Sequence, residues 1–205
     1  MTSAAEAQLA AQAGADLVGL VGPMPSGPGT LTLTQAREIA LAAPAWVDPV
    51  LLTSASAATA IEAQAAQAGA EMVQVVTHIA ADEAARLTGT ALTYIQVIHV
   101  EDAAALDLIP VYAPHVDAFL LDSGRPGLGE LGGTGRLHDW EVSADFVRRA
   151  APVPVFLAGG LTPENVVEAI LKVRPFGVDV CSGLRPDGTL DGARLQRFVA
   201  AVGTA

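Results

Sequence analysis

Seven short apolar runs alternate with eight alanine-rich segments along the chain, and this alternation restricts the possible folds more than any other feature of the sequence. Each apolar run is nearly continuous, which is typical of strands buried on both faces of a parallel sheet. Strands are expected at 16–21, 46–52, 72–76, 93–100, 116–122, 153–159 and 177–183. Helices are expected at 3–13, 33–43, 55–68, 80–88, 102–109, 141–150, 163–172 and 191–202. This strict alternation predicts a parallel sheet covered by helices.

The alternation begins with a helix rather than with a strand. Seven strands and eight helices in this order predict an α/β fold, a TIM (β/α)8-type barrel lacking its first strand. A doubly wound sheet is the alternative architecture, but no G-x-G-x-x-G fingerprint follows the first expected strand. The sequence has 205 residues and no recognisable linker, so we expect a single domain over residues 1–205.

The composition excludes several classes of protein. Hydrophobic residues make up 51% of the chain and aromatic residues only 4%, so the core is expected to be aliphatic. A net charge of −11 argues against a nucleic-acid partner. The apolar runs fall short of the roughly 18 residues of a membrane span, and the first residues do not read as a signal peptide. Cys181 is the only cysteine, which excludes an internal disulfide, and we expect a cytoplasmic protein without a membrane partner.

A carboxylate ends one expected strand and introduces a glycine-rich loop, in the sequence AFLLDSGRPGLGELGGTGRLHDW (118–140). Asp122 follows the apolar run at the point where the strand would reach the surface. The glycines after it supply a flexible backbone with accessible N–H groups. A carboxylate at the carboxyl end of a strand, beside a loop able to close over a ligand, suits acid–base catalysis. An aspartate that caps a surface turn is the alternative.

Two further glycine-bearing loops suit an anionic ligand. The sequence FLAGGLTPENV places Gly159 and Gly160 at the end of a strand, and VCSGLRPDG places Ser182 and Gly183 at the end of the next one. In (β/α)8 proteins, a phosphate often lies on the loops after the seventh and eighth strands, held by backbone N–H groups and a helix N-terminus. We therefore expect a phosphate site here, with glycines that only permit tight turns as the alternative.

Four motifs in the second half of the chain resemble one enzyme family. They are LLDS (120–123), GGTGRLHDW (132–140), LAGGLTPENV (157–166) and RPFGVDVCSGLRPDG (174–188). Together they are similar to phosphoribosylanthranilate isomerase, a (β/α)8 enzyme of tryptophan biosynthesis, and the resemblance extends over nearly the whole chain. The resemblance implies a phosphosugar ligand, N-(5-phosphoribosyl)anthranilate, which undergoes an Amadori rearrangement. This reaction uses neither a metal nor a cofactor.

The resemblance also implies roles for single residues. Asp122 would be the general acid that protonates the ribose ring oxygen. Gly133 and Gly135 would belong to the loop that covers the substrate, and the neighbouring Arg136 is a candidate contact for an anion. The phosphate would be lined by Gly159, Gly160, Ser182 and Gly183.

The chain departs from the family pattern at several positions. The family opens with a strand whose cysteine is the general base, and we expect this chain to lack both the strand and the base. Gly29 stands near the place of an arginine that binds the anthranilate carboxylate, while Val76, Gln96 and Arg185 replace a histidine, a lysine and a glutamate. A start site downstream of the native one would explain the missing strand but not these internal changes. The resemblance therefore implies a diverged relative with an altered isomerase step.

Two residues are candidates for the missing base. Cys181 is expected at a strand end near the phosphate loops, although a lone cysteine in an apolar run is more often a core residue. His99 ends an expected strand and would face the same side as Asp122, with an ordinary pKa that suits proton transfer. His115 and His138 are expected to be structural or solvated.

Two functions from different classes remain open at this point. The first is an isomerase that acts on a phosphoribosyl conjugate, and the second is a non-catalytic protein that binds a phosphosugar on the same barrel. The missing strand would leave unpaired edges at 16–21 and 177–183. We therefore expect either a homodimer that covers these edges or a distorted barrel.

Overall fold

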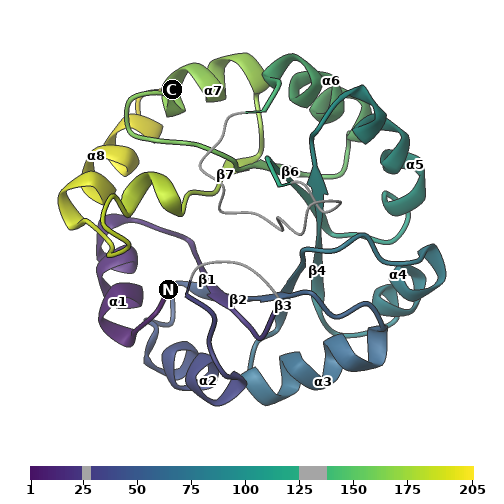
Figure 1. Ribbon diagram of the computed structural model, residues 1–205, viewed down its shortest axis with the longest axis horizontal. Coiled ribbons are helices and arrows are strands. Elements are labelled where there is room, and N and C mark those ends of the chain that lie inside the picture. Colours follow the sequence, from purple (N-terminus) through teal and green to yellow (C-terminus); the bar gives the residue numbers. More distant parts are fainter. Residues whose placement is uncertain (25–28, 125–137) are drawn as a thin grey trace. The chain divides into compact units, whose positions relative to one another are not determined.

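The computed structural model describes residues 1–24, 29–124 and 138–205, in which strands and helices alternate (Figure 1). The strands are β1 (Leu17–Val21), β2 (Asp48–Thr53), β3 (Met72–Val75), β4 (Thr93–His99), β5 (Ala118–Asp122), β6 (Val155–Leu157) and β7 (Gly177–Val178). The helices are α1 (Ala4–Ala13), α2 (Leu33–Ala42), α3 (Ala58–Ala68), α4 (Ala81–Thr88), α5 (Ile109–Tyr112), α6 (Trp140–Ala150), α7 (Val166–Val173) and α8 (Gly192–Val202). Two 3-10 helices, η1 (Ala103–Leu108) and η3 (Ser182–Leu184), complete the described elements.

The seven described strands follow one another in the order β1 to β7, as the alternation predicts. The fold class is therefore α/β, of the TIM (β/α)8 type with seven strands. Contacts between residues divide the chain into two compact units. The first comprises Met1–Gln96 and Pro114–Asp117, and the second comprises Val97–Ala113 and Ala118–Ala205. The expectation of one domain over residues 1–205 stays a prediction.

In the first unit, β1 to β4 form a parallel sheet that α1 to α4 cover on one face (Figure 1). The register pairs Gly19 with Val50 and Leu51 with Val73. Two helices end at glycines in the left-handed region, Gly14 with φ 104° after α1 and Gly69 with φ 66° after α3. The sequence AAQAGA occurs twice and forms the same helix end each time. Its glycine, which has no Cβ, ends the helix and turns the chain into the next strand.

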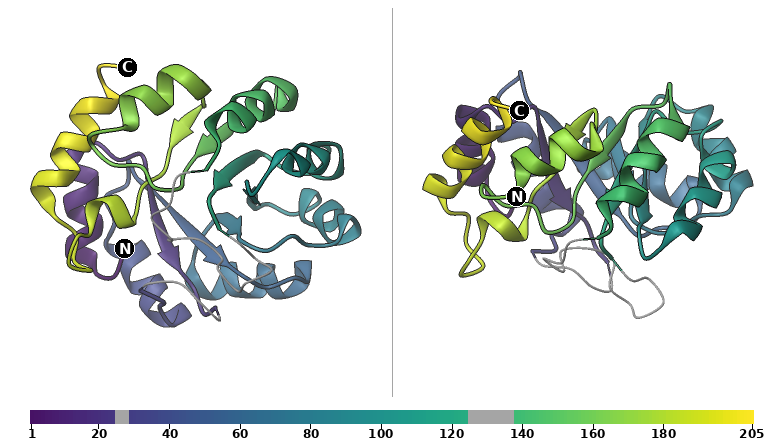
Figure 2. Two further views of the ribbon diagram at one scale, coloured as in Figure 1. Left: turned by 45° about the horizontal axis from the view of Figure 1, so that its top comes forward. Right: turned by 90° about the horizontal axis from the view of Figure 1, so that it is seen from above.

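In the second unit, β5, β6 and β7 are parallel neighbours, and the register pairs Leu120 with Phe156 and Leu157 with Val178. The helices α6, α7 and α8 pack next to one another in chain order (Figure 2). Phe119 of β5 meets Phe146 of α6 edge to face, with ring centroids 5.2 Å apart, and both rings are fully buried. This apolar layer under the sheet holds the strand ends in place.

Three expected elements differ from the structure. The strand expected at 177–183 ends at Val178, because the chain turns into η3 after one more backbone hydrogen bond, from Asp179 to the carbonyl of Leu157 at 2.8 Å. The helix expected at 163–172 begins only at Val166, after a turn closed by Asn165. The helix expected at 102–109 is the 3-10 helix η1, and the short α5 follows it. In the part of the chain that the structure describes, no helix has the length and apolar character needed to cross a membrane.

Candidate active site

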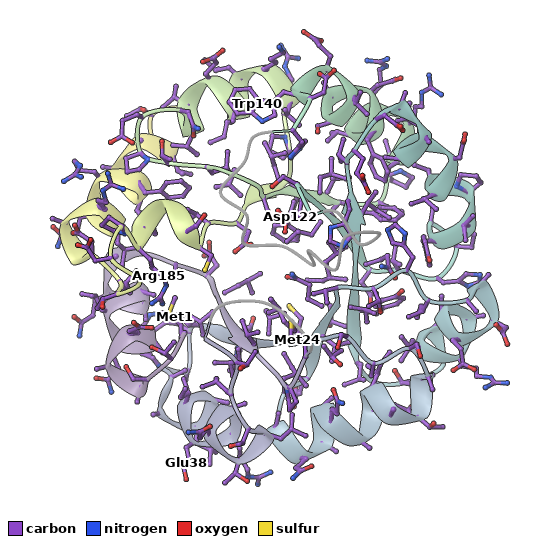
Figure 3. The ribbon with its side chains drawn as sticks, viewed as in Figure 1. Met1, Met24, Glu38, Asp122, Trp140 and Arg185 are labelled. Carbon is purple, nitrogen blue, oxygen red and sulfur yellow. The ribbon has the colours of Figure 1, made fainter. Side chains whose placement is uncertain are left out.

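The carboxyl ends of neighbouring strands bring three titratable side chains together in the second unit. The N–H of Val100, directly after β4, donates to the carbonyl of Asp122 at 2.9 Å. The N–H of Ala158 donates to Leu121 at 2.7 Å, and that of Asp179 donates to Leu157 at 2.8 Å. His99 and Asp122 thus end the neighbouring strands β4 and β5, and Asp179 follows β7, which β6 separates from β5. Asp122 is labelled in Figure 3.

Asp122 lies in an environment that favours its neutral form. Burial raises the pKa of this carboxyl group above its ordinary value. The backbone N–H of Ser123, 2.7 Å from Oδ1, and the charge of the nearby His99 lower the same pKa in part. His99 is only 4% exposed. The sequence prediction that Asp122 stands at a strand end is confirmed, and a raised pKa is what a general acid needs.

Asp179 is a site residue that the sequence reasoning did not single out. Desolvation by the surrounding protein, followed by the negative charge of Asp122, raises its pKa to about 6. The residue is nevertheless exposed to solvent, so a ligand can reach it. It was missed because the whole of GVDVCSG was read as one strand. The pattern of an apolar run that ends in an aspartate, already seen in FLLD, would have identified it.

The loop after β6 has a backbone suited to an anion. Gly159 and Gly160 both have positive φ, 82° and 67°. Asn165 fixes the loop, because its Nδ2 donates to the carbonyl of Gly160 at 3.0 Å and its Oδ1 accepts from the N–H of Thr162 at 2.8 Å. Among the described residues, the N–H groups of Gly159 and Gly160 have no hydrogen-bond acceptor. These two N–H groups remain for a ligand.

The loop after β7 packs directly against the loop after β6. A Cβ on Gly183 would lie 1.9 Å from the carbonyl oxygen of Leu161, so only glycine fits at this contact. Arg194 of α8 donates to the carbonyl of Gly183 at 3.0 Å and holds the turn from the other side. The structure therefore places Ser182 and Gly183 beside the Gly159–Gly160 loop. Their role in binding phosphate stays a prediction.

Cys181 is an exposed free thiol directly before η3. The surrounding protein and then the charge of Asp179 raise the pKa of the thiol, while Arg185 lowers it in part. A thiol with a raised pKa is protonated at neutral pH and is a poor base. This weighs against Cys181 as the base, although its catalytic role stays untested.

Gly133, Gly135 and Arg136 lie outside the described residues, so their predicted roles in covering the substrate and binding an anion stay predictions. Among the described residues, no cluster of histidine, cysteine, aspartate and glutamate is arranged to hold a metal ion.

Gln96, where the resemblance leads one to expect a lysine, has a structural role in the first unit. Its side chain is fully buried, accepts from the hydroxyl of Tyr94, and donates to the carbonyls of Val75 at 3.3 Å and Thr77 at 2.9 Å. These bonds tie β4 to β3. Val76 is also buried, and its N–H donates to the carbonyl of Thr53 at 2.9 Å.

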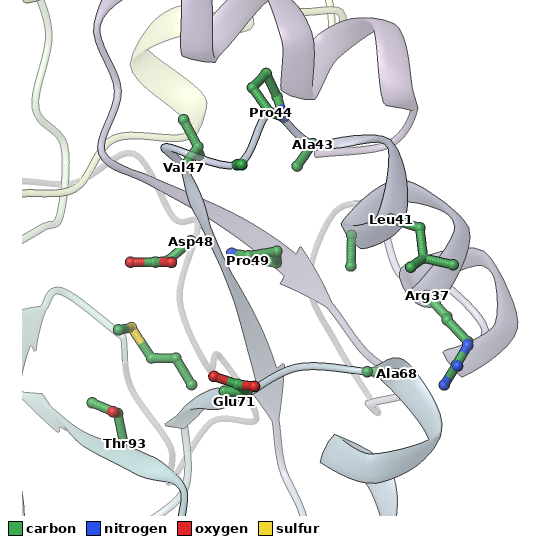
Figure 4. A pocket seen from close by; sticks show the side chains of 14 residues that line it. Arg37, Leu41, Ala43, Pro44, Val47, Asp48, Pro49, Ala68, Glu71 and Thr93 are labelled. Atoms are coloured by element: carbon green, nitrogen blue, oxygen red, sulfur yellow. The ribbon is translucent and has the colours of Figure 1, made fainter.

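An open depression of about 480 Å³ lies elsewhere, at the N-terminal ends of β2, β3 and β4 in the first unit (Figure 4). Arg37, Asp48 and Glu71 supply its charged side chains, and Leu41 and Val47 contribute apolar walls. None of the predicted site residues lines it. The depression is therefore separate from the candidate site at the strand ends of the second unit.

Comparison with known proteins points to one family. A family model described as N-(5'phosphoribosyl)anthranilate (PRA) isomerase matches residues 2–201. The N-(5'-phosphoribosyl)anthranilate isomerase of Haloferax volcanii is 40% identical over 94% of this chain and 86% of its own length. That of Acidithiobacillus ferrooxidans is 39% identical over 98% of this chain and 94% of its own. The crystal structure of phosphoribosyl anthranilate isomerase from Thermotoga maritima, 26% identical, matches with a TM-score of 0.86 over 100% of this chain and 96% of that one.

Proposed function

This chain belongs to the N-(5'-phosphoribosyl)anthranilate isomerase family, and from that premise we propose that the protein catalyses the aldose–ketose isomerisation of N-(5'-phosphoribosyl)anthranilate in tryptophan biosynthesis. The observation that carries the chemistry is the carboxyl pair of Asp122 and Asp179 at the ends of β5 and β7. The two interlocked glycine loops beside the pair support the binding of the phosphate.

The carboxyl pair can hold one proton up to a pH of about 6. Two neighbouring carboxylates resist simultaneous ionisation, and the charge of Asp122 already raises the pKa of Asp179 to about 6. A pair with one proton contains an acid and a carboxylate base at the same time. The pair therefore supplies both functions that an isomerisation needs.

Proton transfer then proceeds in two steps. Asp122 gives the shared proton to the ribose ring oxygen, the C1–O bond breaks, and the nitrogen lone pair forms a C=N bond at C1. Asp179 next removes the proton from C2, which yields the enol form of the aminodeoxyribulose phosphate, and this tautomerises to the ketone. One proton leaves the pair and one returns to it, so the reaction requires no external acid or base. His99 stabilises the ionised form of Asp122 between the two steps.

The phosphate is proposed to lie on the loops after β6 and β7. The N–H groups of Gly159 and Gly160 donate to no described residue and can donate to an anion, and Ser182 adds a hydroxyl donor within the neighbouring turn. This arrangement leaves the ribose ring within reach of the strand ends that carry the carboxyl pair. No metal and no cofactor are proposed.

The direct test of the function is turnover of freshly prepared N-(5'-phosphoribosyl)anthranilate, followed by the loss of its fluorescence. Conversion to the aminodeoxyribulose phosphate supports the isomerase. Binding of the substrate without any conversion would instead support the non-catalytic phosphosugar-binding protein, the alternative function.

We also propose that the protein assembles as a homodimer in the cytoplasm. A crystal structure of monomers generated from the dimeric phosphoribosylanthranilate isomerase of Thermotoga maritima has the same fold, with a TM-score of 0.82. In this chain, Leu41 at the end of α2 and Trp46 in the following loop are 76% and 72% exposed. Large apolar side chains exposed close together in sequence support an interface between copies.

A further inference from the structure

His138 places an imidazole ring against the candidate phosphate loop. It stands two residues before α6, in the second unit. A Cβ built on Gly159 would lie 2.9 Å from Nδ1 of His138 and 3.0 Å from the backbone nitrogen of Ser123. The ring therefore lies next to Gly159 and to the residue that follows Asp122, at the ends of β6 and β5.

Neither nitrogen of this ring has a hydrogen-bond partner among residues 1–24, 29–124 and 138–205. Nδ1 and Nε2 are both buried, and no described residue bonds to either of them. Buried polar atoms of native proteins are nearly always satisfied, so an imidazole whose two nitrogens bond to no described residue is suited to meet a ligand. A position that served packing alone would be filled better by a phenyl ring.

The protonation state of the ring suits hydrogen bonding rather than ion pairing. Burial lowers the pKa of His138 to about 4, although the charge of Asp139 raises it in part. The neutral imidazole has one N–H donor and one nitrogen acceptor at neutral pH. The N–H groups of Gly159 and Gly160 next to it also donate to no described residue. Three donors without acceptors thus lie around one loop.

We propose that His138 is a substrate-binding residue whose ring N–H donates to the phosphate held on the Gly159–Gly160 loop. This inference rests on the proposed function for the identity of the substrate, but the ligand chemistry that it needs is only a phosphate oxyanion. This role was not expected from the sequence, where His138 was predicted to be structural or solvated. The loop geometry and the two open ring nitrogens revise that prediction.

The first test compares His138→Phe with His138→Gln in the full-length protein. Phenylalanine keeps the ring and removes both nitrogens, whereas glutamine restores a neutral donor. We expect His138→Phe to raise the KM for N-(5'-phosphoribosyl)anthranilate, and the Kd for ribose 5-phosphate, about 10-fold, the effect of one good hydrogen bond to a charged group. The glutamine variant should recover part of this loss, and kcat should change less than KM. His115→Phe is the matched control and should leave both constants unchanged.

The second test needs no variant in the binding measurement. Side-chain 15N spectra of the wild-type protein at pH 7, assigned with His138→Gln, should show the His138 nitrogens move when inorganic phosphate is added, while those of His115 stay in place. Unchanged His138 shifts at saturating phosphate, together with an unchanged KM in a folded His138→Phe protein, overturn the inference.

The two tests also separate this inference from the proposed function. Full turnover in a folded His138→Phe variant, with KM unchanged, would contradict the role of His138 and leave the isomerase intact. A response of His138 to phosphate in a wild-type protein that does not turn the substrate over would support the binding role and contradict the isomerase.

Discussion

Gly183 lies so close to Leu161 that a Cβ on the glycine would stand 1.9 Å from the leucine carbonyl oxygen. Because the neighbour is backbone rather than a flexible side chain, it cannot move away without opening the loop after β6. The two loops are thus interlocked, and the position of one determines the position of the other. We expect Gly183→Ala to destabilise the protein by about 1–3 kcal/mol and to weaken the binding of ribose 5-phosphate at least about 10-fold.

Denaturant unfolding and calorimetry measure these two effects of Gly183→Ala. Gly203→Ala is the control, because a Cβ there would meet only ordinary contacts, the nearest at 3.6 Å. Binding as tight as in the wild type in a folded Gly183→Ala protein would show that the interlocked loops do not form the phosphate site.

The pH dependence of the reaction should report the carboxyl pair. Desolvation by the surrounding protein and the charge of Asp122 raise the pKa of Asp179 to about 6, so the pair loses the proton that the two carboxyl groups share, and with it the acid, as the pH rises through that value. We expect kcat/KM to fall on the alkaline side of about pH 6 for the wild type. In Asp179→Asn this limb should shift to lower pH and the remaining activity should be small. Ordinary carboxyl groups stay ionised from about pH 5 to 8. A kcat/KM that does not change over this range would therefore contradict the shared proton.

The carboxyl group of Asp179 should lower the stability of the folded protein at neutral pH. The pKa of Asp179 is raised from 3.8 to about 6, so between these values the folded protein binds more protons than the unfolded chain, and stability falls as the pH rises. We expect Asp179→Asn to raise the Tm at pH 7.5, where the carboxylate of Asp179 is fully ionised beside Asp122. The gain should disappear at about pH 4, near the ordinary pKa of an aspartate.

Asp187→Asn is the matched control for the Tm measurement, because Asp187 is exposed in the same loop region. A Tm of Asp179→Asn that equals the wild-type value at pH 7.5 would show that the carboxylate of Asp179 is well solvated.

The sequence predicted the order of the elements because strand burial and helix ends are local signals. The continuous apolar runs marked β1 to β6, and the two AAQAGA phrases marked the glycines that end α1 and α3. The sequence did not predict where β7 ends, because Val178 and Val180 are both apolar residues typical of a strand. The end of β7 is visible only in the structure, where Gly183 packs against Leu161. Long-range contacts of this kind leave no periodicity in the sequence.

The candidate site was predicted only in part for the same reason. Asp122 was identified from its own strand, but the importance of Asp179 depends on its distance from Asp122 across two strand pairings. His138 was predicted to be structural or solvated because it lies in the loop motif GGTGRLHDW, at a position that is variable in character. Only the packing of its ring against Gly159 shows the two open nitrogens.

The exposed side chains after α2 make the dimer proposal testable. Trp46 and Leu41 would be covered at an interface between copies and are 72% and 76% exposed in the single chain. We expect sedimentation at micromolar concentration to show a dimer for the wild type and a monomer for Trp46→Lys, since a charge in an apolar interface is costly. A wild-type protein that sediments as a monomer would contradict the proposed assembly.

The central claim is that Asp122 supplies the proton that opens the ribose ring. Turnover of N-(5'-phosphoribosyl)anthranilate by Asp122→Asn, measured beside the wild type and Asp187→Asn, tests it most directly. Asparagine keeps the shape of the side chain and cannot donate this proton, so kcat should fall by on the order of 10²–10⁴ while Asp187→Asn keeps the wild-type rate. A wild-type kcat in the folded Asp122→Asn protein would contradict the assignment of Asp122 as the acid.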